Sequence, residues 1–182
     1  MNPRILDILN QLISFDTTSS LSNLALIHYV QHLLQAKGID TTLVHDEAGG
    51  KANLFASVGP KNVPGVLLSG HTDVVPVAGQ AWTRPPFEAT VSDGKLYGRG
   101  SCDMKGFIAV AIHALLSAAD QPLKRPLQLA LSHDEEIGCV GVRRLLDVLH
   151  LAPQRPFLCI VGEPTQMQFA LGHKGKASYR VH

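Results

Sequence analysis

Residues 65–73 read GVLLSGHTD, a short apolar run that ends in a histidine and an aspartate. Two later segments repeat this arrangement, LQLALSHDEE at 127–136 and FLCIVGE at 157–163. Nearly continuous apolar runs are typical of central strands that helices cover on both faces. We therefore expect strands at 66–69, 127–132 and 157–161, each followed by side chains that can bind a metal.

Helical patterns alternate with these strands. Apolar residues recur at three- and four-residue spacing in residues 3–15 and 21–37, and Gly38 stands where a C-cap glycine belongs. We also expect helices at 105–119 and 137–149, strands at 40–45 and 53–58, and a hairpin of residues 87–91 and 95–97 around Ser92-Asp93-Gly94. The pattern predicts an α/β fold, with a mixed central sheet and helices on both faces.

Composition excludes several classes of function. The chain has 182 residues, 45% hydrophobic and 17% charged, which describes one core-rich domain and not a disordered chain. Sixteen basic and fifteen acidic residues give a net charge of +1, without the basic stripe that nucleic acid requires. The most apolar stretch, residues 107–119, is too short to span a bilayer. We expect neither a nucleic-acid nor a membrane partner.

The three cysteines are an odd number without a CxxC pair. This usage fits a reducing cytoplasm, where we expect the protein to be located. Cys139 and Cys159 are interpreted as thiols of the core.

Six side chains that can carry chemistry follow the predicted strands and the hairpin. They are His71, Asp73, Asp103, Glu135, Glu136 and Glu163. Because ligands of open α/β sheets bind at the carboxyl ends of the strands, these separate segments can converge. One imidazole and several carboxylates suit zinc or a similar divalent ion, and a bridging carboxylate permits a two-metal site. Asp73 is placed to orient His71 or to hold a neighbouring group.

Four ordered motifs then identify a family. HTDVVPV at 71–77, GRGSCDMKG at 98–106, HDEEIG at 133–138 and VGEPT at 161–165 resemble the di-zinc metallopeptidases of the acetylornithine deacetylase and succinyl-diaminopimelate desuccinylase family. The SCDMKG form and the HTDVVPVAGQAW stretch look most like acetylornithine deacetylase. The resemblance implies hydrolysis of the acetyl amide of N-acetyl-L-ornithine, a step of arginine biosynthesis. The alternatives are succinyl-diaminopimelate desuccinylase and a related metallo-carboxypeptidase.

The same resemblance assigns roles to the residues. His71, Asp103 and Glu163 would hold one zinc, and Asp103 would bridge to a second zinc bound by Glu136. Cobalt or manganese could substitute for zinc. Glu135 would be the general base, and with Asp73 it forms the predicted catalytic pair. The resemblance also implies a cis peptide bond directly after Asp103.

Family members are longer than this chain. By the resemblance, residues 1–175 form the N-terminal part of the catalytic domain, and residues 176–182 begin a strand that leads toward a dimerisation and lid domain. A later segment would supply a second histidine ligand; His113, His133, His150, His173 and His182 are not expected to replace it. We expect little activity from residues 1–182 alone, as a catalytically incomplete fragment and possible monomer, and a homodimer for the full-length protein.

Other interpretations of these residues stay open. Cys102 with His71 as its base could make a cysteine hydrolase, although four carboxylates would then have no role. A fold relative that binds metal only for structure would not need a free carboxylate at Glu135. Lys105 and Arg99 are expected to be solvated. The Trp82–Phe87 stretch either lines the crevice or braces the loop after His71.

Overall fold

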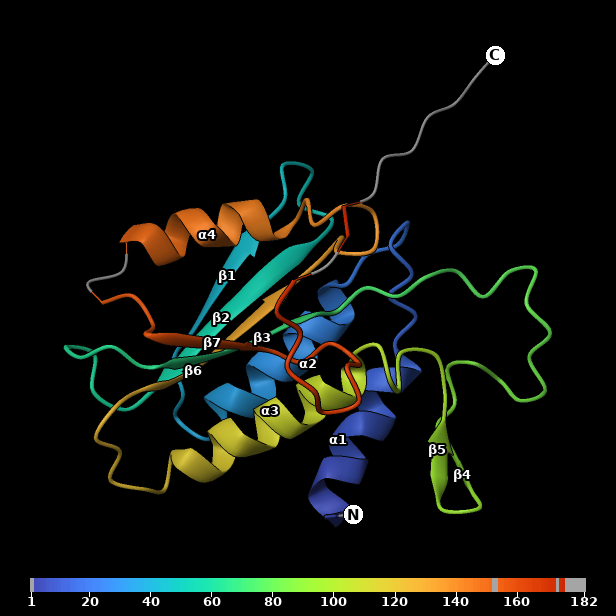
Figure 1. Cartoon of the computed structure of the whole chain (residues 1–182), viewed down its shortest axis with the longest axis horizontal. Helices are drawn as coiled ribbons and strands as arrows, with labels where there is room; N and C mark the ends of the chain where they lie inside the picture. The colour runs from blue at the N-terminus through green and yellow to red at the C-terminus, as the bar shows by residue number, and fades with distance from the viewer. Residues whose placement is uncertain (1, 152–153, 173, 176–182) are drawn as a thin grey trace.

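The five-stranded sheet that the apolar runs predict is the centre of the molecule (Figure 1). A computed structural model describes residues 2–151, 154–172 and 174–175. The predicted strand at 176–182 therefore lies outside the described residues. The sheet has the order β1-β2-β6-β3-β7, and its strands are β1 (Thr41–His45), β2 (Ala52–Val58), β3 (Val66–His71), β6 (Leu127–Ser132) and β7 (Leu158–Val161).

The sheet is mixed, as predicted. β3 pairs in parallel with both β6 and β7, whereas β2 pairs antiparallel with β1 and β6. The carboxyl ends of β3, β6 and β7 therefore point to one edge of the sheet. In parallel sheets this edge is where ligands bind.

Helices cover both faces of the sheet. α1 (Pro3–Ser14), α2 (Leu24–Gln35) and α3 (Lys105–Ala118) form the main core with β2 and β6, and α4 (Val142–Leu151) packs on the opposite face (Figure 1). α3 is the buried apolar helix that residues 107–119 predict. None of the helices in the described segments combines the length and the hydropathy needed to cross a membrane.

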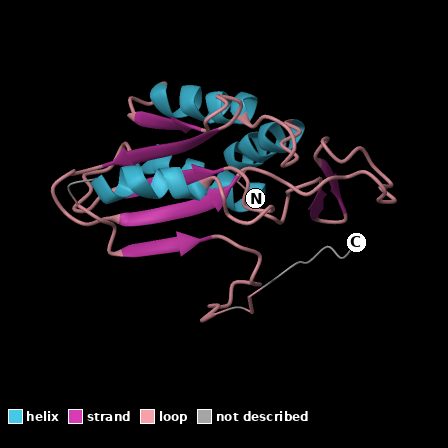
Figure 2. Ribbon diagram, turned by 90° about the horizontal axis from the view of Figure 1, so that it is seen from above, coloured by secondary structure: helices cyan, strands magenta, loops and turns pink. Residues whose placement is uncertain are grey.

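A small hairpin stands apart from this sheet (Figure 2). It consists of β4 (Thr90–Ser92) and β5 (Lys95–Tyr97), so its first strand is shorter than the predicted 87–91. Asp93 and Gly94 both have positive φ, 52° and 72°. Two positive φ angles in succession are what a two-residue hairpin turn requires.

The predicted helix at 137–149 begins too early. α4 starts only at Val142, because Gly138 and Cys139 have positive φ angles of 114° and 54° and cannot continue a right-handed helix. A Cβ on Gly141 would lie 2.1 Å from the backbone oxygen of His133, so the chain passes close to the end of β6 here. The turn keeps residues 135 and 136 out of the helix.

Within the described residues, FLCIV forms an edge strand and not the predicted central strand. β7 lies at one edge of the described sheet and its four residues are exposed, because the contacts of α3 and α4 fall on β2, β3 and β6. Cys159 on this strand and Cys139 in the turn before α4 are therefore exposed and are not core thiols.

Candidate metal centre

The topology brings the predicted ligands to one place. His71 is the last residue of β3, Glu135 and Glu136 follow β6, and Glu163 follows β7. Asp103 lies two residues before α3, which follows β3 and the β4–β5 hairpin in the chain and precedes β6. The carboxyl ends of three parallel strands and the start of one helix thus surround a single centre.

His71 is the buried member of this centre, with 2% of its side chain exposed. Its Nδ1–H donates to the backbone oxygen of Asp73 at 2.9 Å, and its Nε2 lies 2.9 Å from Oδ1 of Asp103. Carboxylate oxygens of Glu163 and Glu135 lie 3.8 and 3.9 Å from the same Nε2. One ring nitrogen is therefore held by the backbone, and the other faces three carboxylates.

Two groups of ligand atoms meet at His71. His71, Asp103 and Glu163 form one, and His71, Glu135 and Glu136 form the other, with ligand atoms within 4.8 Å of one another in each. Burial and the charge of Asp103 raise the pKa of Glu136, and burial with nearby carboxylates raises that of Glu163. Negative charge is in excess here, which a divalent cation would compensate, and one imidazole with carboxylates is a donor set that suits zinc.

Asp73 is 2% exposed and holds the backbone of residues that line this centre. Its carboxylate accepts hydrogen bonds from the backbone N–H of Glu135 at 3.0 Å and of Glu136 at 3.3 Å. Burial would raise the pKa of Asp73, but hydrogen bonds from His71, Ser19 and Glu135 lower it to about 2. Burial would likewise lower the pKa of His71, but the hydrogen bonds and charge of Asp73 raise it to about 9.

The segment after Asp103 lies under His71. The Asp103–Met104 peptide bond is cis, as the resemblance implies, and the buried Met104 sulfur accepts a hydrogen bond from the backbone N–H of His71 at 3.3 Å. The prediction that Lys105 is solvated is wrong: it is fully buried, and its Nζ donates to the backbone oxygen of Phe15 at 2.8 Å. Burial lowers the pKa of Lys105 to about 7.

A hollow of about 210 Å³ adjoins the centre and is lined by Asp103, Glu136, Arg99 and Cys102 among others. Cys102 is exposed, and both ring nitrogens of His71 are engaged by aspartate oxygens and not by the Cys102 thiol. Arg99 is not freely solvated, because its guanidinium lies 5.1 Å from the ring of Trp82 and donates to Gln80.

Trp82 braces the loop after His71. Its Nε1–H donates to Oε1 of Gln80 at 2.9 Å, the same oxygen that Arg99 contacts. Of the two interpretations of residues 82–87, these contacts support the bracing one.

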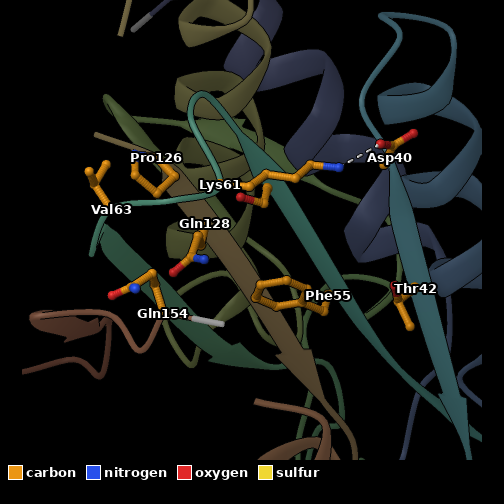
Figure 3. Close-up of a pocket in the computed structure, with 9 residues that line it drawn as sticks. Asp40, Thr42, Phe55, Lys61, Val63, Pro126, Gln128 and Gln154 are labelled. Carbon is orange, nitrogen blue, oxygen red and sulfur yellow. Dashed lines mark hydrogen bonds and ion pairs between the residues drawn. The ribbon is translucent and has the colours of Figure 1, made fainter. Parts of the chain in front are cut away.

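A second hollow, of about 230 Å³, lies on the face of the sheet that α4 covers (Figure 3). Phe55 and Gln128 lie in it, and the ion pair of Lys61 and Asp40 stands at its rim. None of its lining residues belongs to either ligand group, so although it is slightly larger, the candidate chemistry lies in the first hollow.

The model of the family described as peptidase family M20/M25/M40 matches residues 67–180, more than half of the chain. The chain belongs to this family. The matched region contains all six predicted site residues.

Solved structures share the fold of this M20 chain. Human carnosine dipeptidase 1 has a TM-score of 0.73 at 23% identity, over 87% of this chain and 38% of that chain. An M20 family metallo-carboxypeptidase of Sulfolobus solfataricus has a TM-score of 0.74 at 21% identity, over 87% and 37%. A dinuclear metal binding M20 peptidase of Bacillus subtilis has a TM-score of 0.57 at 18% identity, over 84% and 40%. The chain thus spans about two fifths of the length of these M20 structures.

The remaining histidines do not enter the centre in the part of the chain that the structure describes. His133 is buried and pairs with Asp134, His113 contacts Asn2, and His150 lies in the last turn of α4. His173 and His182 lie outside the described residues. Sequence reasoning missed two side chains near the centre, Ser19, which donates to Asp73, and Lys51, which donates to Asp134.

Proposed function

We propose that this chain carries the metal-binding part of an amide hydrolase that acts on small N-acylated amino acids. The observation that carries the proposal is the buried imidazole of His71, whose Nε2 lies within 4 Å of oxygens from Asp103, Glu135 and Glu163. Within the proposal, His71, Asp103 and Glu163 hold one zinc ion, and Asp103 and Glu136 contribute to a second. Cobalt and manganese are possible substitutes, since they accept the same donors.

The bound ions would lower the pKa of a water molecule and polarise the substrate carbonyl. The chain's own residues do the rest. The hydrogen bond from Nδ1–H of His71 to Asp73 directs Nε2 toward the carboxylates and sets which nitrogen is free to bind.

Glu135 is the group placed to move the proton. Its carboxylate is 38% exposed and one oxygen lies 3.9 Å from Nε2 of His71, so it reaches both the centre and solvent. A carboxylate in this position can accept a proton from an attacking water and pass it to the leaving amine. The backbone N–H of Glu135 donates to Asp73, and this hydrogen bond fixes the backbone position from which the Glu135 side chain extends.

The favoured substrate is N-acetyl-L-ornithine, which hydrolysis converts to ornithine and acetate. The SCDMKG and HTDVVPVAGQAW segments support this choice by their resemblance to acetylornithine deacetylase. N-succinyl-diaminopimelate is the nearest alternative. Similarity to a human carnosine dipeptidase and an archaeal metallo-carboxypeptidase favours a second candidate, hydrolysis of a short peptide.

The wider setting follows from the same proposal. Three unpaired and exposed cysteines favour the cytoplasm. The expected partner is a small-molecule substrate, and we propose neither a nucleic-acid nor a membrane partner. For the full-length protein we propose a homodimer.

Substrate preference can be tested on the complete protein loaded with Zn²⁺. The kcat/KM values for N-acetyl-L-ornithine, N-succinyl-diaminopimelate and carnosine are compared from the release of a primary amine. We expect N-acetyl-L-ornithine to exceed the others at least tenfold, and a chelator to abolish turnover. A preference for carnosine would contradict N-acetyl-L-ornithine as the substrate and would support the second candidate, hydrolysis of a short peptide. Failure to cleave any of the three amides would contradict the proposal.

A further inference from the structure

We infer that Ser19 and Lys51 form a positioning pair that sets the geometry of the metal centre from the far side of Asp73. The inference rests on the proposed function, because it concerns how the same centre is held. Neither residue contacts a candidate ligand side chain. Ser19 acts through Asp73, which contacts His71, and Lys51 acts through Ser19 and through Asp134, the residue before Glu135.

Ser19 completes the set of hydrogen bonds to Asp73. Its Oγ–H donates to Oδ2 of Asp73 at 2.7 Å, and the N–H groups of Glu135 and Glu136 donate to the same carboxylate. His71 Nδ1 lies 3.6 Å from Oδ1. We call residues 17–19, which follow α1, the strap. Asp73 therefore connects this strap to His71 and to both glutamates.

The strap is held on both sides. The backbone N–H of Ser19 donates to the oxygen of Val74 at 3.2 Å, and that of Val74 donates to the oxygen of Thr17 at 3.1 Å. The hydroxyl of Thr17 donates to the backbone oxygen of Thr72 at 2.6 Å. Residues 17–19 thus run beside residues 72–74 and bring the Ser19 hydroxyl to Asp73.

Lys51 joins this strap to the glutamate turn. Its Nζ donates at 2.5 Å to the backbone oxygen of Ser19 and at 2.5 Å to Oδ1 of Asp134. The side chains of Lys51 and Asp134 are 17% and 12% exposed, so this ion pair is largely shielded from water. Asp134 has a φ of 56°, the left-handed turn through which the chain leaves β6 and reaches Glu135 and Glu136.

The Lys51 ammonium therefore holds both the strap that carries Ser19 and the turn that carries Asp134. Without it, Oδ1 of Asp134 loses its cationic partner while Oδ2 keeps only its contact with His133, and the backbone oxygen of Ser19 loses a hydrogen bond. A shielded oxygen left without a donor is costly. Without the Ser19 hydroxyl, one oxygen of Asp73 loses a donor. In each case the Glu135 and Glu136 backbone and the His71 ring become less well defined, and displacements below 1 Å are enough to weaken binding and catalysis.

The test compares Lys51→Met, Lys51→Arg and Ser19→Ala in the complete protein. Lys61→Met is the matched control, because it removes the same charge from an exposed ion pair with Asp40. Two quantities are measured: the Zn²⁺ dissociation constant by chelator competition, and hydrogen exchange of the Glu135 and Glu136 amides in metal-free protein. The visible spectrum of the Co²⁺-loaded protein reports the ligand geometry.

We expect Lys51→Met and Ser19→Ala to weaken Zn²⁺ binding roughly 10- to 100-fold, the range for groups that orient metal ligands. The two amides should exchange at least tenfold faster, while the exchange of the Ile112 amide in α3 stays unchanged. Lys51→Arg should recover most of both losses, and Lys61→Met should show neither.

Wild-type exchange of both glutamate amides in Lys51→Met and Ser19→Ala would overturn the inference, and so would equal acceleration at Ile112, which would indicate general destabilisation. If the wild-type protein binds no divalent metal, the proposed function fails. The exchange of the two amides then decides the positioning role by itself.

Discussion

His71 donates from Nδ1 to the backbone oxygen of Asp73, two residues further along the chain, at 2.9 Å. This contact leaves Nε2 facing the carboxylates of Asp103, Glu135 and Glu163. The ring orientation suited to metal binding is thus set by the backbone at the end of β3, and loss of the Nε2 proton then leaves that nitrogen free for an ion.

Replacement of Glu135 by Gln should abolish turnover and keep the metal. An amide cannot accept the proton of an attacking water, so we expect kcat of the complete enzyme to fall about 10²- to 10⁴-fold. Steady-state hydrolysis and metal content check this expectation. Glu88→Gln, an exposed site away from the centre, should behave as wild type. Normal turnover in Glu135→Gln would show that Glu135 is not the general base.

Metal uptake should release a proton at neutral pH. The raised pKa of His71, about 9, means that its metal-free imidazole is protonated at pH 7, and the ion must displace the Nε2 proton. Apparent affinity should rise about tenfold per pH unit from pH 7 and level off near pH 9. Calorimetric titrations in buffers of different ionisation enthalpy count the protons.

His45→Gln is the control for this titration, because His45 is exposed and lies on β1, outside both ligand groups. It should leave the number of released protons unchanged. Zinc binding that releases no proton and does not vary between pH 7 and 9 would contradict a protonated His71 in the metal-free centre.

Replacement of Cys102 by Ser should leave activity within about twofold of wild type. The thiol is exposed, and the ring nitrogens of His71 are engaged by Asp73 and Asp103, so His71 does not act as its base. Rates of amide hydrolysis by the complete enzyme are compared for the two proteins. Near-total loss in Cys102→Ser would restore the cysteine hydrolase interpretation.

Gly141→Ala should destabilise the fold, because a Cβ there would lie 2.1 Å from the backbone oxygen of His133. Forced contacts of this kind cost about 1–3 kcal/mol. Gly50→Ala is the control, since a Cβ at Gly50 would meet nothing within 4 Å. Urea unfolding monitored by circular dichroism measures the difference, and equal midpoints would show that the turn before α4 relaxes without cost.

The sequence predicts the strands, and the convergence of the side chains that follow them, well where local pattern and topology coincide. β6 has the predicted bounds, and the parallel alignment of β3, β6 and β7 is why His71, Glu135 and Glu163 meet. The late start of α4 depends on left-handed residues at Gly138 and Cys139, which apolar periodicity does not register.

Burial and long-range support were harder to predict. β7 is as apolar as a central strand, yet its exposure depends on where the helices pack. Ser19 and Lys51 are far from the motifs in sequence, and only tertiary contacts reveal their role. The polar run DTTSS at 16–20 was one available signal, since a buried polar segment after a helix requires partners.

The most direct test of the central claim is the zinc content of the purified chain after equilibration with Zn²⁺ and removal of excess. We predict at least one ion per chain, held by His71, Asp103 and Glu163, and loss of that ion in Glu163→Gln. A chain without bound zinc, or a Glu163→Gln variant that retains the wild-type content, would contradict the assignment of these residues as a metal centre.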